Sequence, residues 1–284
     1  MMKLIEPSYN FEDTLNHCIA GISGNNLLKQ KVTNSNALFK LKEDEYLKLA
    51  RTGMLHTISP ISNRNANPIV INNLTKSELV NIYEQYFVNK SKPARKIYDA
   101  LLNAAKEKCP FCGGIGTPSN LDHFLPKTHF PQFSVMPRNL VPACRDCNMD
   151  GKGHSYATNA NDQIIQPYLD NSRFFNDQWI FADYQSINLI DPGVFKYYIS
   201  APSHWTVDDK KRVESHFNSF NLAKRYSVQA AEQLGMVLQQ INNLTALGLD
   251  SLAIKSSLLQ PGVVTSPFPN HWKKGMYQAL LNAF

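Results

Sequence analysis

Two pairs of cysteines are the residues of this chain whose spacing most directly indicates chemistry. They are Cys109-x-x-Cys112 and Cys144-x-x-Cys147, and 31 residues separate the pairs. Each pair can hold a metal ion from a tight turn, and four thiolates fill the tetrahedral shell of zinc, which leaves no position for water. The pattern therefore predicts a structural zinc site that clamps the two ends of a folded insert.

The cysteines also have other interpretations. They could be unrelated residues in turns, or a redox pair of the C-x-x-C type. A redox pair normally opens a helix in a βαβ unit, and the surrounding sequence has no such pattern. The chain has five cysteines, an odd number, which argues against a disulfide framework. The fifth, Cys18, has no partner at metal-ligand spacing and is interpreted as a core thiol.

Between and just after the cysteine pairs lie polar residues that also suggest a metal. Asp122 and His123 stand in the stretch LDHFLPK, and Asn139 stands in RNLVPAC. Asn148 directly follows the second cysteine pair, and Lys152 comes four residues later. The surrounding stretch is rich in Cys, Pro, Gly, His and Asn. Such a segment buries little apolar surface, so a metal is expected to organise it.

Taken in this order, the elements resemble the HNH endonucleases, whose core is the ββα-metal motif, in their zinc-clamped branch. The resemblance covers residues 109–155, about one sixth of the chain. Each element alone is weak, but the ordered set, with the second cysteine pair overlapping the start of the motif's helix, is a strong match. The resemblance implies an α+β fold: a small ββα-metal HNH core with a four-cysteine zinc clamp, embedded in a mainly helical scaffold.

The resemblance also implies a role for each polar residue. His123 would be the general base, because a neutral imidazole can take a proton from water. Asp122 would point to the other side of the strand and bind a catalytic metal together with Asn148. Asn139 would brace the loop and position His123 through the backbone, and Lys152 would contact phosphate.

The third position of the motif departs from the family pattern. The family often has His where this chain has Asn148. Asp122 and Asn148 form an all-oxygen pair, which favours magnesium or manganese over zinc or nickel at the catalytic site. The expected cofactors are therefore a structural zinc ion and a catalytic magnesium or manganese ion.

The same residues also have purely structural interpretations. Asp122 would cap a turn, and His123 would be a satisfied, partly buried histidine. Asn139 would be a turn residue and Lys152 a solvated surface residue. Two nearby histidines are interpreted as surface or substrate-side residues rather than ligands: His129 and His154.

The expected function is hydrolysis of phosphodiester bonds, with DNA as the first candidate substrate. The net charge is +6, which permits a polyanionic partner but implies modest affinity for it. The layout also resembles the HNH subunit of Septu-type and retron-associated antiphage systems, which work with a separate ATPase. That resemblance implies a role in bacterial defence. Two alternatives stay open: an effector that cleaves RNA such as tRNA, and a non-catalytic zinc-stabilised adaptor for nucleic acid or protein.

Three regions are expected along the chain. Residues 1–108 form a helical N-terminal region, and residues 109–155 form the HNH core with its zinc knuckles. Residues 156–284 form a mixed, then helical, C-terminal region that packs on the core. No run approaches the roughly 18–20 consecutive apolar residues of a membrane helix. No membrane partner and a cytoplasmic location are therefore expected.

Local patterns predict several elements. Residues 1–70 are expected to be irregular and partly helical, and Thr75-x-x-Glu78 has the form of a capping box. Basic residues at 210–212 and 224–225 are interpreted as solvated helix faces. The remaining predicted elements are helices from Pro93 to about Lys108, over 222–244 and over 270–284, and β-like pieces at 164–170 and 179–200.

Overall fold

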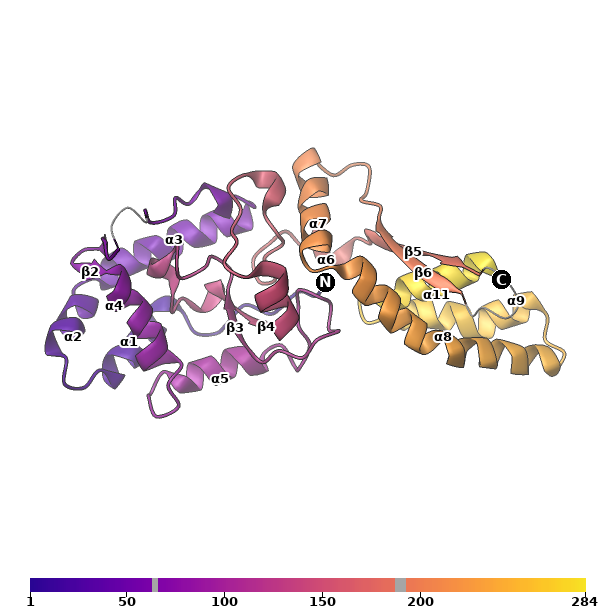
Figure 1. The fold of residues 1–284 in the computed structure, drawn as a ribbon, viewed down its shortest axis with the longest axis horizontal. Coiled ribbons are helices and arrows are strands. Elements are labelled where there is room, and N and C mark those ends of the chain that lie inside the picture. Colours follow the sequence, from indigo (N-terminus) through magenta and orange to yellow (C-terminus); the bar gives the residue numbers. More distant parts are fainter. Residues whose placement is uncertain (63–65, 187–192) are drawn as a thin grey trace.

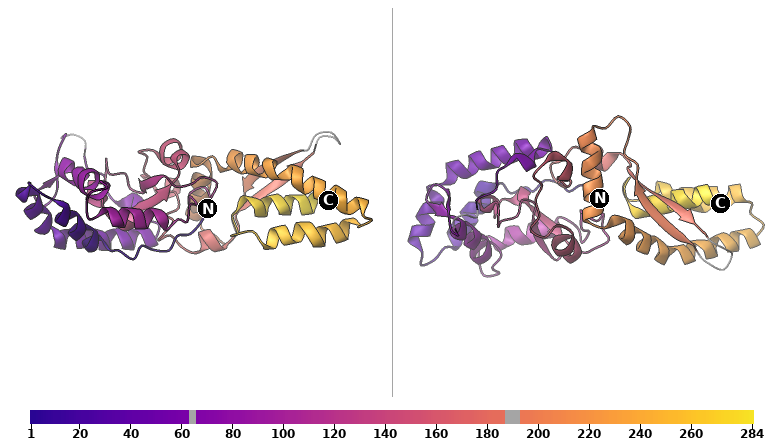
Figure 2. Two further views of the ribbon diagram at one scale, coloured as in Figure 1. Left: turned by 90° about the horizontal axis from the view of Figure 1, so that it is seen from below. Right: turned by 45° about the horizontal axis from the view of Figure 1, so that its top comes forward.

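The computed structural model describes residues 1–62, 66–186 and 193–284 and shows an elongated molecule (Figure 1). The N-terminal helices lie at one end, and the C-terminal helices lie at the other. The turned views keep this long outline and place the N-terminus near the middle of the molecule (Figure 2). None of the described helices is long and apolar enough to cross a membrane.

The N-terminal region is more regular than its sequence indicated. Helices fill most of residues 1–51, where an irregular and only partly helical stretch was expected. The predicted capping box at Thr75 is confirmed, because the Thr75 hydroxyl accepts from the Glu78 N–H and the Glu78 carboxylate accepts from the Thr75 N–H. The elements are α1 (Phe11–Gly21), α2 (Asn26–Thr33), α3 (Asn36–Arg51), η1 (Leu55–Thr57), β1 (Ile69–Ile71), β2 (Leu74–Thr75), α4 (Lys76–Asn81) and the π-helical η2 (Ile82–Phe87).

The helix expected to run to about Lys108 ends earlier. Helix α5 spans Arg95–Asn103. Lys106 and Glu107 have φ angles of 48° and 61°, in the left-handed region that an α-helix cannot contain. The chain therefore turns out of the helix before it reaches Cys109.

A small hairpin and a helical turn form the centre of the molecule. Strand β3 (Asn120–His123) pairs antiparallel with β4 (Leu140–Ala143). The loop between them contains two short 3₁₀ turns, η3 (Pro131–Phe133) and η4 (Pro137–Asn139). The π-helical segment η5 (Asp146–Lys152) follows β4. Helix α5 packs against both strands.

The β-like prediction for residues 164–170 was wrong. The segment forms a turn after η6 (Ala160–Asp162) and before α6 (Arg173–Asn176). The Gln166 side-chain oxygen accepts from the N–H groups of Tyr168 and Leu169, at 2.6 and 2.8 Å. This side chain satisfies backbone donors that a partner strand would otherwise bind.

The C-terminal region is built on an amphipathic hairpin. Strand β5 packs on helix α11, and strand β6 packs on helix α8. In β6, Phe195 and Tyr197 are buried while Val194 and Lys196 are exposed, which is the alternation of a one-sided strand. The elements are β5 (Ile180–Gln185), β6 (Val194–Ile199), α7 (Val207–Ser219), α8 (Leu222–Ala246), α9 (Ser251–Ile254), η7 (Lys255–Leu259), α10 (Gln260–Val264) and α11 (Trp272–Ala283).

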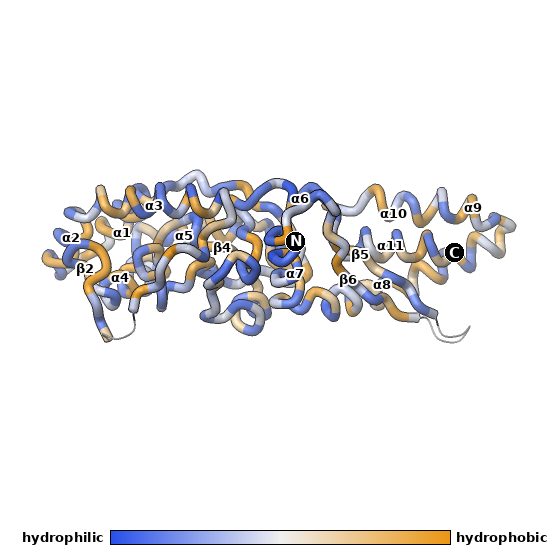
Figure 3. The backbone as a smooth tube through the Cα atoms, turned by 90° about the horizontal axis from the view of Figure 1, so that it is seen from above, coloured by the Kyte–Doolittle hydropathy of each residue, from blue (hydrophilic) through white to orange (hydrophobic). Residues whose placement is uncertain are grey.

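The long helices were predicted, and the prediction of strands over 179–200 is confirmed at β5 and β6. Residues 187–192 of that range lie outside the described residues. Helix α8 contains the whole predicted range 222–244, and its colouring by hydropathy alternates between apolar and polar residues along its length (Figure 3). The described residues contain helices and three two-stranded sheets, which agrees with the expected α+β class.

Candidate metal centre and active site

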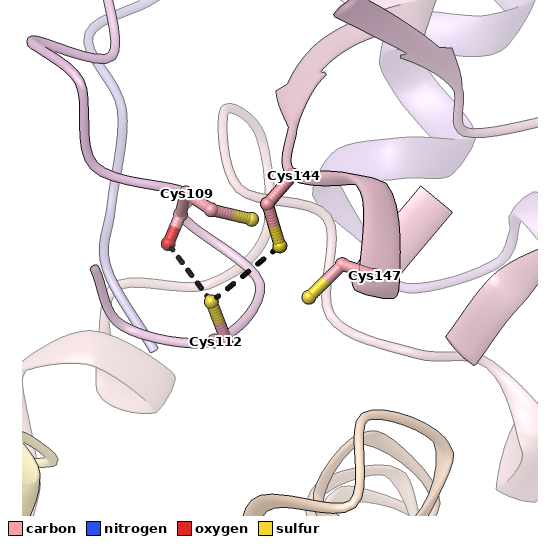
Figure 4. Close-up of side chains that lie close together, drawn as sticks. All are labelled: Cys109, Cys112, Cys144 and Cys147. Carbon is pink, nitrogen blue, oxygen red and sulfur yellow. Dashed lines mark hydrogen bonds between the residues drawn. The ribbon is translucent and has the colours of Figure 1, made fainter. Parts of the chain in front are cut away.

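The four cysteines of the two C-x-x-C pairs converge on one point. Their sulfur atoms all lie within 4.8 Å of one another, and all four residues are buried (Figure 4). Cys112 Sγ and Cys144 Sγ are 4.0 Å apart. A tetrahedral zinc ion with bonds of about 2.3 Å places its sulfur ligands about 3.8 Å apart. The cluster therefore fits a structural zinc ion.

The loop around the first cysteine pair is shaped by close backbone contacts. The Cys109 N–H donates to the Gly116 carbonyl at 2.9 Å, and the Gly116 N–H donates to Cys112 Sγ at 3.3 Å. A Cβ atom on Gly116 would lie only 2.5 Å from Cys144 Sγ. Glycine is required at this position because the two knuckles approach each other there.

The fifth cysteine lies outside this cluster, as expected. Cys18 is fully buried in α1, and burial raises the pKa of its thiol to about 12. In contrast, each cysteine of the cluster has three other sulfur atoms within 4.8 Å, which is the arrangement of metal-bound thiolates. Thiolates bind metal, whereas a buried thiol of high pKa behaves as a small apolar side chain.

An arginine from the C-terminal region completes the cluster. Arg225 on α8 donates to Cys147 Sγ at 3.2 Å and to Cys144 Sγ at 3.8 Å. Its positive charge favours the thiolate form of both cysteines. The interpretation of the basic residues as solvated was wrong for Arg225 and for Arg212, which is buried and paired with Asp170, but Lys211 and Lys224 are exposed.

A cavity of about 200 Å³ opens beside the hairpin. It brings together Asp122, His123 and Asn148, which come from β3 and η5. Successive side chains of a strand point to opposite faces, but Asp122 and His123 both border this cavity. The other lining residues are Tyr83, Leu121, Pro126, Lys127, Gly153 and His154.

His123 is held in one orientation and one tautomer. Its Nε2 lies 2.8 Å from the Ser134 carbonyl oxygen, which can only accept, so Nε2 carries the proton. The Tyr83 ring meets the imidazole edge-on, with centroids 4.5 Å apart. Burial lowers the pKa of His123 to about 3, so the ring is neutral at pH 7. Its Nδ1 accepts no hydrogen bond from the described part of the chain.

Asn139 is fully buried and ties the loop between the strands together. Its Oδ1 accepts from the Leu125 N–H at 2.8 Å and from the Tyr46 hydroxyl at 3.2 Å. Its Nδ2 donates to the carbonyls of Leu125 and Phe133, and its own carbonyl accepts from the Phe124 N–H. These bonds fix the backbone directly after His123.

Lys152 is buried, whereas the sequence indicated a residue that contacts phosphate or solvent. Its side chain is 4% exposed and its Nζ lies 3.3 Å from Asp122 Oδ2. The same ammonium donates to Asp122 Oδ1 at 3.4 Å and to the His123 carbonyl at 2.5 Å. A group buried in this way does not present itself to a phosphate in solution. Burial raises the pKa of Asp122 to about 6, although Lys152 opposes the shift.

Asn148 contributes a side-chain amide to the cavity. Its Nδ2 donates to Asn120 Oδ1 at 3.0 Å, which leaves Oδ1 without a donor among the described residues. Its backbone carbonyl accepts from the Gly153 N–H at 2.8 Å. Gly153 has a φ angle of 53°, so the chain reverses there, directly after Lys152.

Sequence reasoning missed two residues of these sites. Tyr83 comes from η2, and a π-helical turn of this kind is frequent at functional sites. Arg225 comes from α8, and 78 residues separate it from Cys147. Both contacts are long-range, and no local sequence pattern signals them.

Comparison with known proteins gives one relative that matches along the whole chain. Protein ea31 of Escherichia phage lambda is 40% identical over 294 aligned residues, which cover 100% of this chain and 98% of that protein. The chain belongs to the ea31 family. No protein-family model and no solved structure matches the chain.

A second relative matches only part of this chain. Septu protein PtuB of Bacillus thuringiensis is 35% identical over 83 residues, which are 28% of this chain and 30% of that protein. This partial similarity supports the Septu-type part of the resemblance that the sequence motifs indicated.

Proposed function

We propose that this chain is a metal-dependent HNH endonuclease. One observation carries the proposal: the neutral His123, with its free Nδ1, borders the same cavity as the Asp122 carboxylate. Phosphodiester hydrolysis requires a base for the attacking water and a hard oxygen ligand for a cation. Both groups are present in this cavity.

The arrangement of the elements supports the proposal. The hairpin β3–β4 and the helical segment η5 follow one another in the order of a ββα unit. Asn120 at the start of β3 pairs with Ala143, the residue before Cys144. The four-cysteine cluster therefore lies at the end of the hairpin opposite His123 and clamps the chain on both sides of it.

Two oxygen atoms of the cavity are suited to a divalent cation. Asp122 Oδ2 is buried and accepts no hydrogen bond within the described chain, although the Lys152 ammonium lies 3.3 Å away. Asn148 Oδ1 has no donor among the described residues. These two residues would hold magnesium or manganese, which prefer oxygen ligands. When bound, the cation would neutralise the scissile phosphate and stabilise the leaving oxygen.

The protein's own residues would handle the proton. His123 Nδ1 takes the proton of the attacking water, and the Ser134 carbonyl stabilises the resulting imidazolium through the Nε2–H. A phosphate in the cavity raises the pKa of His123, because a nearby negative charge favours the protonated ring. Asn139 and Tyr83 position His123, through the loop and through ring contact respectively.

We propose DNA as the first substrate and a role in bacterial defence with a separate ATPase subunit. The similarity to Septu protein PtuB supports the defence role. The modest net charge of +6 supports a partner that delivers the substrate. The chemistry acts on phosphate, which DNA and RNA share, so cleavage of RNA is the alternative activity.

The test is a cleavage assay on plasmid DNA and total RNA with magnesium or manganese. Wild type should cut one of them, and His123→Ala should lose at least about 100-fold in rate because it lacks the base. The matched control is His204→Ala, since the His204 side chain is 73% exposed in the C-terminal region. Zinc-loaded protein that leaves both substrates intact, alone and with a co-purified ATPase, would overturn the proposal in favour of an adaptor.

A further inference from the structure

We infer that Lys152 makes cation binding at this cavity depend on the phosphate of the substrate. The inference rests on the proposed nuclease function and deepens it. It starts from the contacts of one buried ammonium group, which bonds Asp122 and the His123 carbonyl and not solvent.

The ion pair between Lys152 and Asp122 is buried, although Asp122 borders the cavity. The two side chains are 4% and 6% exposed. The ammonium also donates to the His123 carbonyl, and Gly153 holds the following chain by its hydrogen bond to Asn148. Removing one partner of such a pair leaves an uncompensated buried charge, so the lysine stays in place.

The charges around the cavity leave little attraction for a free cation. Asp122 is the one acidic residue among the described residues that line it. Lys152 already neutralises that carboxylate, and Lys127 is occupied by Glu84 at 2.9 Å. A divalent cation that arrives alone meets a neutralised carboxylate and a nearby ammonium, and both weaken its binding.

A substrate phosphate in the cavity makes binding of the divalent cation favourable. Magnesium is commonly held by one or two carboxylates together with substrate phosphates, so the phosphate supplies the missing negative charge. Cation and nucleic acid then strengthen each other's binding, and this coupling is reciprocal. Lys152 is therefore a positioning residue that also prevents the site from filling with metal in the absence of substrate.

Three variants separate the charge of Lys152 from its hydrogen bonds. Lys152→Gln keeps a donor for Asp122 or the His123 carbonyl but removes the charge, and Lys152→Arg keeps the charge. Lys127→Gln removes a lysine charge from the lining of the cavity, but one that Glu84 already pairs, and is the matched control.

The experiment is a manganese titration of the zinc-loaded full chain, followed by electron paramagnetic resonance of free manganese. A short DNA duplex is then added, and the manganese bound by DNA alone is subtracted. We expect wild type to bind manganese at least about tenfold more tightly with DNA than without it. Without DNA, Lys152→Gln should bind it at least about tenfold more tightly than wild type, whereas Lys152→Arg and Lys127→Gln should resemble wild type.

Two results would overturn the inference. The first is that the Lys152→Gln variant, with zinc bound and with the melting temperature of wild type, has the same manganese affinity as wild type. The other is a wild-type affinity that DNA leaves unchanged, which needs no variant and holds even if Lys152→Gln does not fold. Failure of the nuclease proposal gives a different result: no manganese binding by any form, with DNA present, and no cleavage.

Discussion

The segment 109–155 and residues 176–284 of the C-terminal region are held together in different ways. The segment has two four-residue strands and short helical turns, and it buries Asp122, His123, Asn139 and Lys152. The C-terminal region has six-residue strands and a helix of 25 residues with an apolar face. Regular amphipathic elements stabilise the second region, whereas polar bonds, four cysteines and apolar side chains buried from short or irregular elements organise the first.

This difference shows where the chain can carry reactive groups. In the segment several buried polar groups have specific partners from another region, such as Tyr46 for Asn139 and Arg225 for the cysteines. The expectation that this segment buries little apolar surface was wrong, because Phe111, Phe130 and Phe133 are fully buried in the core. The site still depends on the metal, which holds the four cysteines together. The C-terminal region contributes Arg225 to the segment, and His216 of the same region bonds the Phe111 carbonyl.

The largest effect is expected on removal of a zinc ligand. Cys144→Ser should lose zinc and unfold residues 109–155, because a structural zinc site contributes about 10 kcal/mol or more to folding. Helices α8 and α11 should stay folded. Zinc content by mass spectrometry and hydrogen exchange along the chain measure both effects.

The control for this change is Cys18→Ser, which alters a buried cysteine outside the cluster. It should keep zinc, and its free energy of unfolding should fall only by the contribution of one buried thiol. Loss of exchange protection in α8 and α11 on Cys144→Ser would contradict the distinction between the two regions.

The sequence was most informative about the segment 109–155, which contains the motifs. The spacing of Cys109, Cys112, Cys144 and Cys147 predicted one cluster, because the ligands of one ion must meet at one point. Helix α8 was predicted because its apolar residues recur at helical spacing and so lie on one face of the helix. These features are encoded locally or by the geometry of a metal.

What sequence reasoning missed depends on contacts between distant residues. Lys152 was expected to contact phosphate or to be a solvated surface residue, but the fold brings Asp122 against it across 30 residues. Arg225 was assigned to solvent because a basic residue on a helix is usually exposed, yet it faces the cysteine cluster. Residues 164–170 have the apolar composition of a strand, but Gln166 turns the chain there. Side-chain bonds of this kind leave no periodic signal.

A smaller effect is expected where the two regions meet. Arg225→Gln removes the charge beside Cys144 and Cys147 and should weaken zinc binding by about tenfold, the usual scale for a residue behind the ligands. Arg225→Lys should recover part of the loss. Competition with a zinc chelator measures the affinity.

The neighbouring exposed residue provides the control for Arg225. Lys224→Gln also removes one positive charge from α8 and should leave zinc affinity unchanged. Equal losses for Lys224→Gln and Arg225→Gln would show that only the overall charge of the helix acts on zinc.

The smallest effect concerns acid sensitivity of the C-terminal region. His271 caps α11 by accepting from the Lys273 N–H at 3.2 Å, and burial lowers its pKa to about 3. The unfolded chain binds a proton near pH 6.5, so the stability that the neutral ring contributes is present above that pH and is lost as pH falls toward 3. His271→Asn keeps a capping acceptor without this titration.

The variant should therefore lose less thermal stability than wild type between pH 7 and pH 5, by no more than about 3 °C because the ring is partly exposed. His204→Asn, at an exposed histidine of the same region, should leave the wild-type slope intact. If His271→Asn keeps the full wild-type slope, the acid sensitivity comes from elsewhere. The zinc-bound segment would then be the first place to look, because zinc ligands must lose protons to bind and acid opposes that loss.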